Sequence, residues 1–332
     1  MRIRKEDIIE KPYILLDWNV IKYLKTPREK YKHLDENCME IITKIKSKYA
    51  FPFCEAHFKD LAQSYSENNK DLVNSDLEFL KNISGEIVLG MDENNKFIMT
   101  RHSVYDMFNG IISEKECKPS ISPNINPQLS FNVDMEKLDI NHPLKDMLQN
   151  SNGVYTPGIL ANWMNELFDK FFDEIDDYKK LRNYIPKLKQ DIINNCGKGI
   201  DTQYEKKLLN HINPFLDSIT IDDENKLATI WKDVVYEWIT MKYDKNTNIN
   251  PGELLTTGYS LLDLHPLFRE KLKKKNKLSN IVRDSKMILY ASESKYFVTE
   301  DKNSRKKAEF LFKSFGLKSK VLDIDNFVSR FS

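Results

Sequence analysis

The 332-residue chain lacks several features that mark common metal sites, nucleotide sites and membrane spans. None of its four cysteines stands in a C-x-x-C pair, so neither a cysteine zinc site nor a dense disulfide framework is expected. No glycine-rich phosphate loop occurs, which argues against a nucleoside triphosphatase. The N-terminal sequence MRIRKEDIIEK has no apolar core of the kind found in signal peptides, and no apolar run reaches about eighteen residues. We therefore expect a cytoplasmic protein with reduced cysteines.

The composition is that of a soluble globular chain, with 40% hydrophobic and 30% charged residues. The length suits one large domain with an insertion, or two domains, and is ample for a hydrophobic core. Lysine plus arginine (51) nearly balances aspartate plus glutamate (50). A balanced total does not exclude a nucleic-acid partner, because a local basic patch decides such binding.

The two ends of the chain have the pattern of a parallel α/β fold. Near the N-terminus we expect a buried strand over 12–16, followed by helices over 35–48, 54–65 and 70–82. Near the C-terminus we expect a helix over 281–293, a strand over 296–300, a helix over 304–315 that ends at Gly316, and a strand over 320–324. Short connections between alternating helices and strands imply right-handed crossovers and a parallel sheet that also includes the first strand.

The middle of the chain differs from both ends. Residues 117–146 are rich in proline, asparagine and serine, which predicts a long irregular connection. Helical periodicity returns over 157–195 and 202–243, where Trp231, Val234, Val235 and Trp238 form an apolar stripe. We therefore predict that residues 85–260 form a mostly α-helical insertion between residues 1–84 and 261–332, which together build the α/β domain.

Acidic side chains follow the predicted strands. Asp17 ends the first strand and Asp301 follows the 296–300 strand, so strand direction alone brings both to the carboxyl edge of the sheet. Asp284 precedes Met287, Ile288 and Ala291 by three, four and seven residues, which places it on the buried stripe of its helix. An N-cap role is the plain alternative for Asp284.

A fourth acid is expected on the helix over 54–65. Asp60 stands at the edge of its buried stripe, and Glu55 in the first turn is a rival for the same role. Taken alone, either could be an ordinary solvent-facing carboxylate. Several carboxylates at one edge repel each other at neutral pH, and a divalent cation relieves that repulsion. Oxygen-rich sites suit Mg²⁺ or Mn²⁺, which can polarise a phosphoryl group and generate hydroxide. The pattern points to metal-assisted hydrolysis of a phosphodiester.

In the order of these motifs the chain resembles the PIN-domain ribonucleases, over about 12–82 and 265–326. The sequence LLDWN supplies Asp17 and Asn19, DSKMILYA supplies Asp284, and FVTED supplies Thr299 and Asp301. The sequence CEAHFKDL supplies Asp60, but it departs from the family pattern, in which the acid is usually glutamate and serine usually stands where Cys54 does.

The resemblance implies a PIN-like three-layer fold with a central parallel sheet, and a Mg²⁺- or Mn²⁺-dependent endonuclease that most often cuts RNA. The products would carry a 5′-phosphate and a 3′-hydroxyl. In those terms Asp17, Asp60, Asp284 and Asp301 hold the metal, and Asn19 and Thr299 orient ligands or water. Larger bacterial relatives are often linked to phage defence or RNA turnover, whereas the small toxin members lack an insertion of this length.

Two basic runs are candidates for binding the nucleic-acid backbone. The run REKLKKKNKL contains Lys273 and Lys274 just before the Asp284 helix, and DKNSRKK places Lys302, Arg305 and Lys306 beside Asp301. Phosphate binding needs such charge. Either run could equally be a solvated helix face. His57 lies one helical turn before Asp60 and is more typical of a structural histidine than of a substrate contact.

Two other functions remain open. An aspartyl phosphatase also ends its first strand in aspartate, but it needs a second aspartate where Asn19 stands. A catalytically inactive domain that binds RNA or a protein partner fits the departure at Asp60. Three roles are possible for the insertion, namely substrate recognition, homo-oligomer formation and the binding of a protein partner.

Overall fold

The computed structural model describes residues 7–116, 213–240, 249–271 and 278–332, together with short pieces between 131 and 187. The chain divides into two compact units. The first unit comprises Met1–Glu114, Arg182–Lys271 and Asn280–Ser332, and the second comprises Lys115–Leu181 and Leu272–Ser279. Within the second unit, strands β4 (Phe131–Asn132) and β5 (Val154–Tyr155) pair antiparallel.

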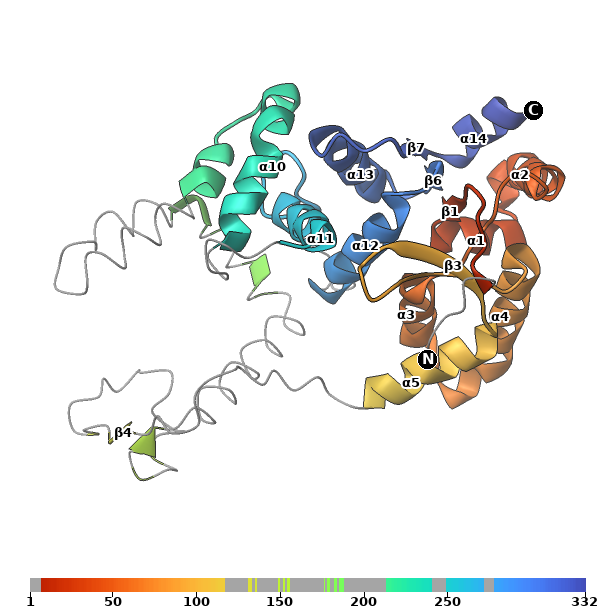
Figure 1. The fold of residues 1–332 in the computed structure, drawn as a ribbon, viewed down its shortest axis with the longest axis horizontal. Coiled ribbons are helices and arrows are strands. Elements are labelled where there is room, and N and C mark those ends of the chain that lie inside the picture. Colours follow the sequence, from red (N-terminus) through yellow and green to blue (C-terminus); the bar gives the residue numbers. More distant parts are fainter. Residues whose placement is uncertain are drawn as a thin grey trace. The chain divides into compact units, whose positions relative to one another are not determined.

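The first unit contains a parallel sheet built from both ends of the chain. Its strands are β1 (Ile14–Leu16), β6 (Tyr296–Val298) and β7 (Lys320–Leu322), in the order β1-β6-β7. Leu15 pairs with Phe297, which in turn pairs with Val321, and both pairings are parallel. Figure 1 shows β6 and β7, in blue, beside β1, in red. The protein is therefore mixed α/β, and the prediction that the two ends of the chain share one parallel sheet is confirmed.

The chain on the other side of β1 continues this sheet through single bridges. Ala50 pairs parallel with Tyr13, and Phe53 pairs parallel with Val88. Val88 belongs to strand β2 (Ile87–Met91), which forms an antiparallel hairpin with β3 (Phe97–Arg101). The hairpin lies in a stretch for which the sequence predicted helix. Its two short, mostly apolar runs and the polar turn between them, in which Asn95 has a φ of 60°, are nevertheless typical of a hairpin.

Helices follow and surround the strands of the first unit. In chain order they are α1 (Trp18–Lys25), α2 (Lys32–Ile45), α3 (Glu55–Ser64), α4 (Lys70–Ser84), α5 (Val104–Glu116), α10 (Glu224–Thr240), α11 (Pro251–Leu262), α12 (Leu278–Ala291), α13 (Lys302–Ser314) and α14 (Ile324–Phe331). Two 3₁₀ turns, Glu29–Tyr31 and Glu67–Asn69, precede α2 and α4. The predicted helices near both ends are confirmed within a few residues of their bounds.

Alternation along the strands buries both faces of the sheet. Ile14, Leu16 and Val298 belong to a core cluster that also contains side chains from α1, α2, α4 and α14. Leu15 and Phe297 point to the opposite face by the strand period and are fully buried there as well. A sheet that is covered on both faces leaves its strand ends as the place where polar side chains can gather.

Helices α10, α11 and α13 pack against one another around a second aromatic core. Trp231 lies edge-on to Phe310 with the ring centroids 5.9 Å apart, and both residues are buried. Of the predicted stripe in α10, Trp231, Val234 and Val235 are buried, whereas Trp238 is half-buried. Gly316 has a φ of 66° just after α13, so the predicted left-handed end of that helix is confirmed.

Several sequence predictions fall on residues that the structure does not describe. The irregular connection over 117–146 and the helix over 157–195 lie for the most part outside the described residues.

Cys38 and Cys54 are buried free thiols. In the described part of the chain, no helix is long and apolar enough to cross a membrane.

Candidate carboxylate site

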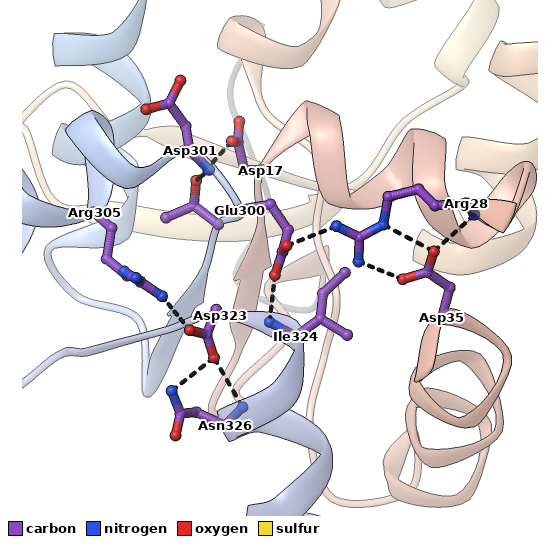
Figure 2. A network of polar contacts seen from close by, with 10 residues as sticks. Asp17, Arg28, Asp35, Glu300, Asp301, Arg305, Asp323, Ile324 and Asn326 are labelled. Atoms are coloured by element: carbon purple, nitrogen blue, oxygen red, sulfur yellow. Dashed lines mark hydrogen bonds and ion pairs between the residues drawn. The ribbon is translucent and has the colours of Figure 1, made fainter. Parts of the chain in front are cut away.

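The carboxyl edge of the sheet holds Asp17 and Asp301, linked by Thr299. Asp17 immediately follows β1, and its backbone N–H donates to the carbonyl oxygen of Val298 at 2.9 Å. The Thr299 hydroxyl donates to Asp17 Oδ2 at 2.8 Å and accepts from the backbone N–H of Asp301 at 3.2 Å. Thr299 is fully buried, and Figure 2 shows Asp17 and Asp301 close to each other. Strand direction therefore brings these two acids together, as the sequence predicted.

Asp301 also caps helix α13. Its Oδ1 accepts from the backbone N–H groups of Asn303 at 2.8 Å and Ser304 at 3.0 Å. Both bonds end on one oxygen, and the residue is exposed. A carboxylate in this position is stabilised by the helix N-terminus and keeps its second oxygen for other partners.

Asp284 lies on the inner side of α12. The helix begins at Leu278, so Asp284 is in its second turn and cannot cap it, and the N-cap alternative is excluded. Burial first of all raises the pKa of Asp284 well above its usual range. The charges of Asp17, Asp60, Glu270 and Asp301 raise this pKa further. The carboxylate of Asp284 therefore lies within electrostatic reach of all three other predicted acids.

Burial and neighbouring negative charges also raise the pKa of Asp17. Burial raises its pKa to about 6, and the charges of Asp60 and Asp301 add to the effect. The Thr299 hydrogen bond opposes this shift, because it favours the ionised form. Two half-buried carboxylates with raised pKa values at one edge of a sheet are typical of a place that accepts a proton or a cation.

Asp60 reaches the same region but already has a positively charged partner. Arg283 Nε donates to Asp60 Oδ1 at 2.8 Å, and Arg283 Nη2 donates to Asn280 Oδ1 at 2.7 Å. Asp60 and Arg283 come from α3 and α12, so this ion pair ties the two helices together. The sequence did not predict that the weakest of the four motif matches would carry a bound arginine.

Glu55, the rival of Asp60, is bound by two lysines. It forms ion pairs with Lys59, one helical turn on, and with Lys286 of α12 at 3.2 Å. Burial alone would raise the pKa of Glu55, but the two lysines outweigh burial and lower it. The charge of Asp60 acts on both Asp17 and Asp284.

The acids share a neighbourhood without forming a compact ligand set. Within the ranges of residues that the structure describes, no group of three or more histidine, cysteine, aspartate or glutamate side chains is placed so that it could hold a metal ion. Asn19, the predicted orienting residue, lies half-buried in the first turn of α1, two residues after Asp17.

His57 has a structural role. Its Nδ1 accepts from the backbone N–H of Cys54 at 3.0 Å, so its Nε2 carries the proton and donates to the carbonyl oxygen of Leu16 at 2.7 Å. The imidazole is fully buried, and burial lowers its pKa. A neutral His57 therefore joins the start of α3 to the end of β1, one residue before Asp17.

The basic side chains beside Asp301 are used in different ways. Lys302 is exposed. Arg305 forms an ion pair with Asp323, and Lys306 donates to the Leu267 carbonyl oxygen at 3.0 Å (Figure 2 draws the former). Lys307 is buried and bonds to Asp263 and Glu270. Lys273 and Lys274 lie outside the described residues.

Sequence reasoning missed a polar network beside the site. Arg28 donates from its backbone N–H, Nε and Nη2 to the buried carboxylate of Asp35 at 2.9, 3.0 and 2.6 Å. Its Nη1 donates to Glu300 Oε2 at 2.7 Å, and Glu300 Oε1 accepts from the Ile324 N–H at 2.8 Å. Figure 2 shows this chain of contacts beside Asp17. Glu300 stands between Thr299 and Asp301, so the network holds the segment that carries both.

Comparison of the chain with models of known protein families, with curated proteins and with solved structures found no match.

Proposed function

We propose that the protein is a metal-dependent endonuclease of PIN-like fold that hydrolyses phosphodiester bonds, with RNA as its substrate. The observation that carries the proposal is the pair Asp17 and Asp284. Burial raises the pKa values of both side chains, the charges of Asp60 and Asp301 add to the shift of Asp17, and the charge of Asp17 adds to that of Asp284. Asp17 lies at the carboxyl edge of the sheet, where open α/β folds place their sites, and its charge acts on Asp284.

The donor set is chemically suited to a hard divalent cation. Mg²⁺ is commonly bound through only one or two carboxylates, and water and substrate phosphate complete its shell. Asp17 and Asp284 would hold the ion, while Asp301 and Asp60 would act beside them or through water. When bound, such an ion neutralises charge on the phosphate and lowers the pKa of a coordinated water.

The surrounding residues would keep the acids in place for this chemistry. Thr299 fixes one oxygen of Asp17 through its 2.8 Å hydrogen bond. Asn19, two residues on, would orient a ligand or water. Lys302 is exposed beside Asp301 and would contact a substrate phosphate as a point charge. Arg305 and Lys306 would have to leave their present partners to do the same.

The second candidate is a catalytically inactive PIN-like module that binds RNA or a protein. The Asp60–Arg283 ion pair favours it, because an arginine in that place satisfies the carboxylate without a metal ion. The two candidates differ in what they do to RNA. The endonuclease produces new RNA ends and needs Asp17 and a divalent cation to do so, whereas the inactive module produces none.

Cleavage of an end-labelled single-stranded RNA separates the two candidates. We expect wild-type protein to produce defined fragments with Mn²⁺ and none with EDTA, and Asp17→Asn to abolish the fragments. Asp71→Asn makes the same chemical change at an exposed position of α4 and should cleave like wild type. If wild type and Asp17→Asn give the same fragments, or if neither gives any, the endonuclease proposal is wrong. A DNA of the same sequence, run in parallel, defines the substrate class.

A further inference from the structure

Tyr259 in α11 has a buried hydroxyl without a hydrogen bond. The residue is fully buried, and in the described part of the chain its hydroxyl oxygen has no hydrogen-bond partner. Buried tyrosine hydroxyls usually find a partner, because an unpaired polar atom in the interior is costly. Tyr259 lies outside both stretches that resemble the PIN-domain family, so no motif assigns it a role.

The ring of Tyr259 is held firmly in place. Lys307 Nζ lies 5.2 Å from the ring centroid, and the same ammonium group bonds to Asp263 Oδ1 at 3.1 Å and to Glu270 Oε1 at 2.6 Å. At the neighbouring Gly258, an added Cβ would lie 3.3 Å from side-chain atoms of both Leu311 and Val235. Helix α11 is thus closely packed here, and the Tyr259 ring contacts α13 through Lys307.

The ring of Tyr259 lies beside Lys307, which is one turn along α13 from Ser304, and the hydroxyl is within electrostatic reach of the proposed carboxylate site. Besides burial, which is the largest cause, the charges of Asp284, Glu270 and Asp301 raise the pKa of Tyr259. Ser304 approaches from the first turn of α13, where its backbone N–H bonds to Asp301, and its side chain lowers this pKa. The Ser304 hydroxyl nevertheless makes no hydrogen bond of ordinary geometry with Tyr259. The phenol stays neutral and therefore remains a donor.

We infer that Tyr259 is a positioning residue of the carboxylate site, whose hydroxyl donates a hydrogen bond to a water molecule held beside Asp284. A buried water needs two to four polar partners, and Tyr259, Asp284 and Ser304 can supply them. A neutral donor holds this water without adding charge to the site. The inference rests on the proposed endonuclease function, and it gives α11 a part in that function.

The test compares Tyr259→Phe with Tyr13→Phe, because each removes one buried hydroxyl oxygen. Tyr13 lies at the opposite end of β1, and its hydroxyl donates to the Tyr290 carbonyl oxygen at 2.7 Å. For Tyr259→Phe we expect kcat for Mn²⁺-dependent RNA cleavage to fall by on the order of tenfold, with KM within about twofold of wild type, since one hydrogen bond in the transition state is lost. We expect its Tm to be no lower than that of wild type. Tyr13→Phe should lower Tm by a few degrees and leave kcat unchanged.

Each other outcome has a definite meaning. If wild type cleaves and Tyr259→Phe has the same kcat, the inference is wrong while the endonuclease proposal stands. If Tyr259→Phe and Ser304→Ala lower Tm by the same amount and leave kcat unchanged, the partner of Tyr259 is Ser304 and its role is structural. If wild type itself does not cleave RNA with Mn²⁺, the endonuclease proposal is wrong, and the inference about Tyr259 is wrong with it.

Discussion

Asp17→Asn is expected to stabilise the metal-free protein at pH 8 by about 3 kcal/mol, because it removes a half-buried charge that the fold does not neutralise. The pKa of Asp17 is raised to about 6, roughly two units above the usual value, and each unit corresponds to about 1.4 kcal/mol. Asparagine keeps an oxygen that can accept the Thr299 hydrogen bond. The same change that should abolish cleavage should therefore increase the free energy of unfolding, which is typical of a residue kept for function.

The sign of the pH dependence distinguishes this cause from a packing effect. Below about pH 4 the Asp17 carboxyl is protonated in both the folded and the unfolded chain, so its burial costs little. Between about pH 4 and pH 6 the unfolded chain loses this proton while the folded protein keeps it, and the stability of wild type falls. Above about pH 6 the full cost remains.

Urea unfolding in EDTA at pH 4.5 and pH 8 measures this dependence. The gap in free energy between Asp17→Asn and wild type should be small at the lower pH and near its full size at the higher pH. The charge of Asp17 raises the pKa of Asp284, so Asp284 also costs wild type more than Asp17→Asn at pH 8 and widens the gap in the same direction. Asp71→Asn should show no such gap at either pH. A gap of equal size at both pH values, or an Asp17→Asn protein that is less stable at pH 8, would contradict the explanation.

Arg28→Met should lower the free energy of unfolding by roughly 3–5 kcal/mol. The substitution leaves the fully buried Asp35 without the two side-chain hydrogen bonds that neutralise it, and it also frees Glu300. Stranding one partner of a buried ion pair has costs of this size. The hydrogen bonds that Arg28 donates to Asp35 raise the pKa of Arg28 above its usual value, so the arginine stays charged at and below neutral pH.

Two further variants separate the stranded charge from the loss of side-chain volume. Lys32→Met removes a cation from an exposed pair with Glu36 in the same helix, and it should change stability by less than about 0.5 kcal/mol. The double variant Arg28→Met with Asp35→Leu removes the stranded charge as well and should recover much of the loss. Chemical denaturation at pH 7 measures all three. Equal losses in Arg28→Met and in the double variant would show that packing, and not charge, causes the effect.

The parallel sheet and its flanking helices could be predicted because their signals are local. The runs ILL and YFV are short and wholly apolar, α13 has a clean stripe, and Gly316 marks the end of that helix. Short connections then leave little freedom for the strand direction. The positions of Asp17 and Asp301 at one edge follow from that direction and need no further information.

The hairpin β2–β3 could have been recognised but was assigned to the helical insertion. Residues 87–101 contain two runs of five around a polar turn, and the parallel bridge between Phe53 and Val88 attaches this hairpin to the chain beside β1. The attachment depends on a contact between segments that are far apart in sequence, and no local pattern encodes it.

The details of the site depend on contacts that no motif contains. Asp60 and Arg283 are 223 residues apart in sequence, so their ion pair depends on how α3 packs against α12. A lysine run such as DKNSRKK does not reveal that Lys307 is buried while Lys302 is exposed. In the sequence, Tyr259 looks like any aromatic residue on the buried stripe of a helix. Its unpaired hydroxyl, which distinguishes it from the others, is visible only in the structure.

A Mn²⁺-binding titration tests the central claim most directly. Electron paramagnetic resonance measures the binding as a loss of the signal of the free ion. We predict that wild type binds Mn²⁺ and that Asp17→Asn and Asp284→Asn each weaken binding by about tenfold or more, since each removes one charged ligand from a half-buried site. Asp71→Asn should bind as wild type does. If wild type binds no Mn²⁺, or if both site variants bind it with unchanged affinity, the carboxylate edge is not a metal site.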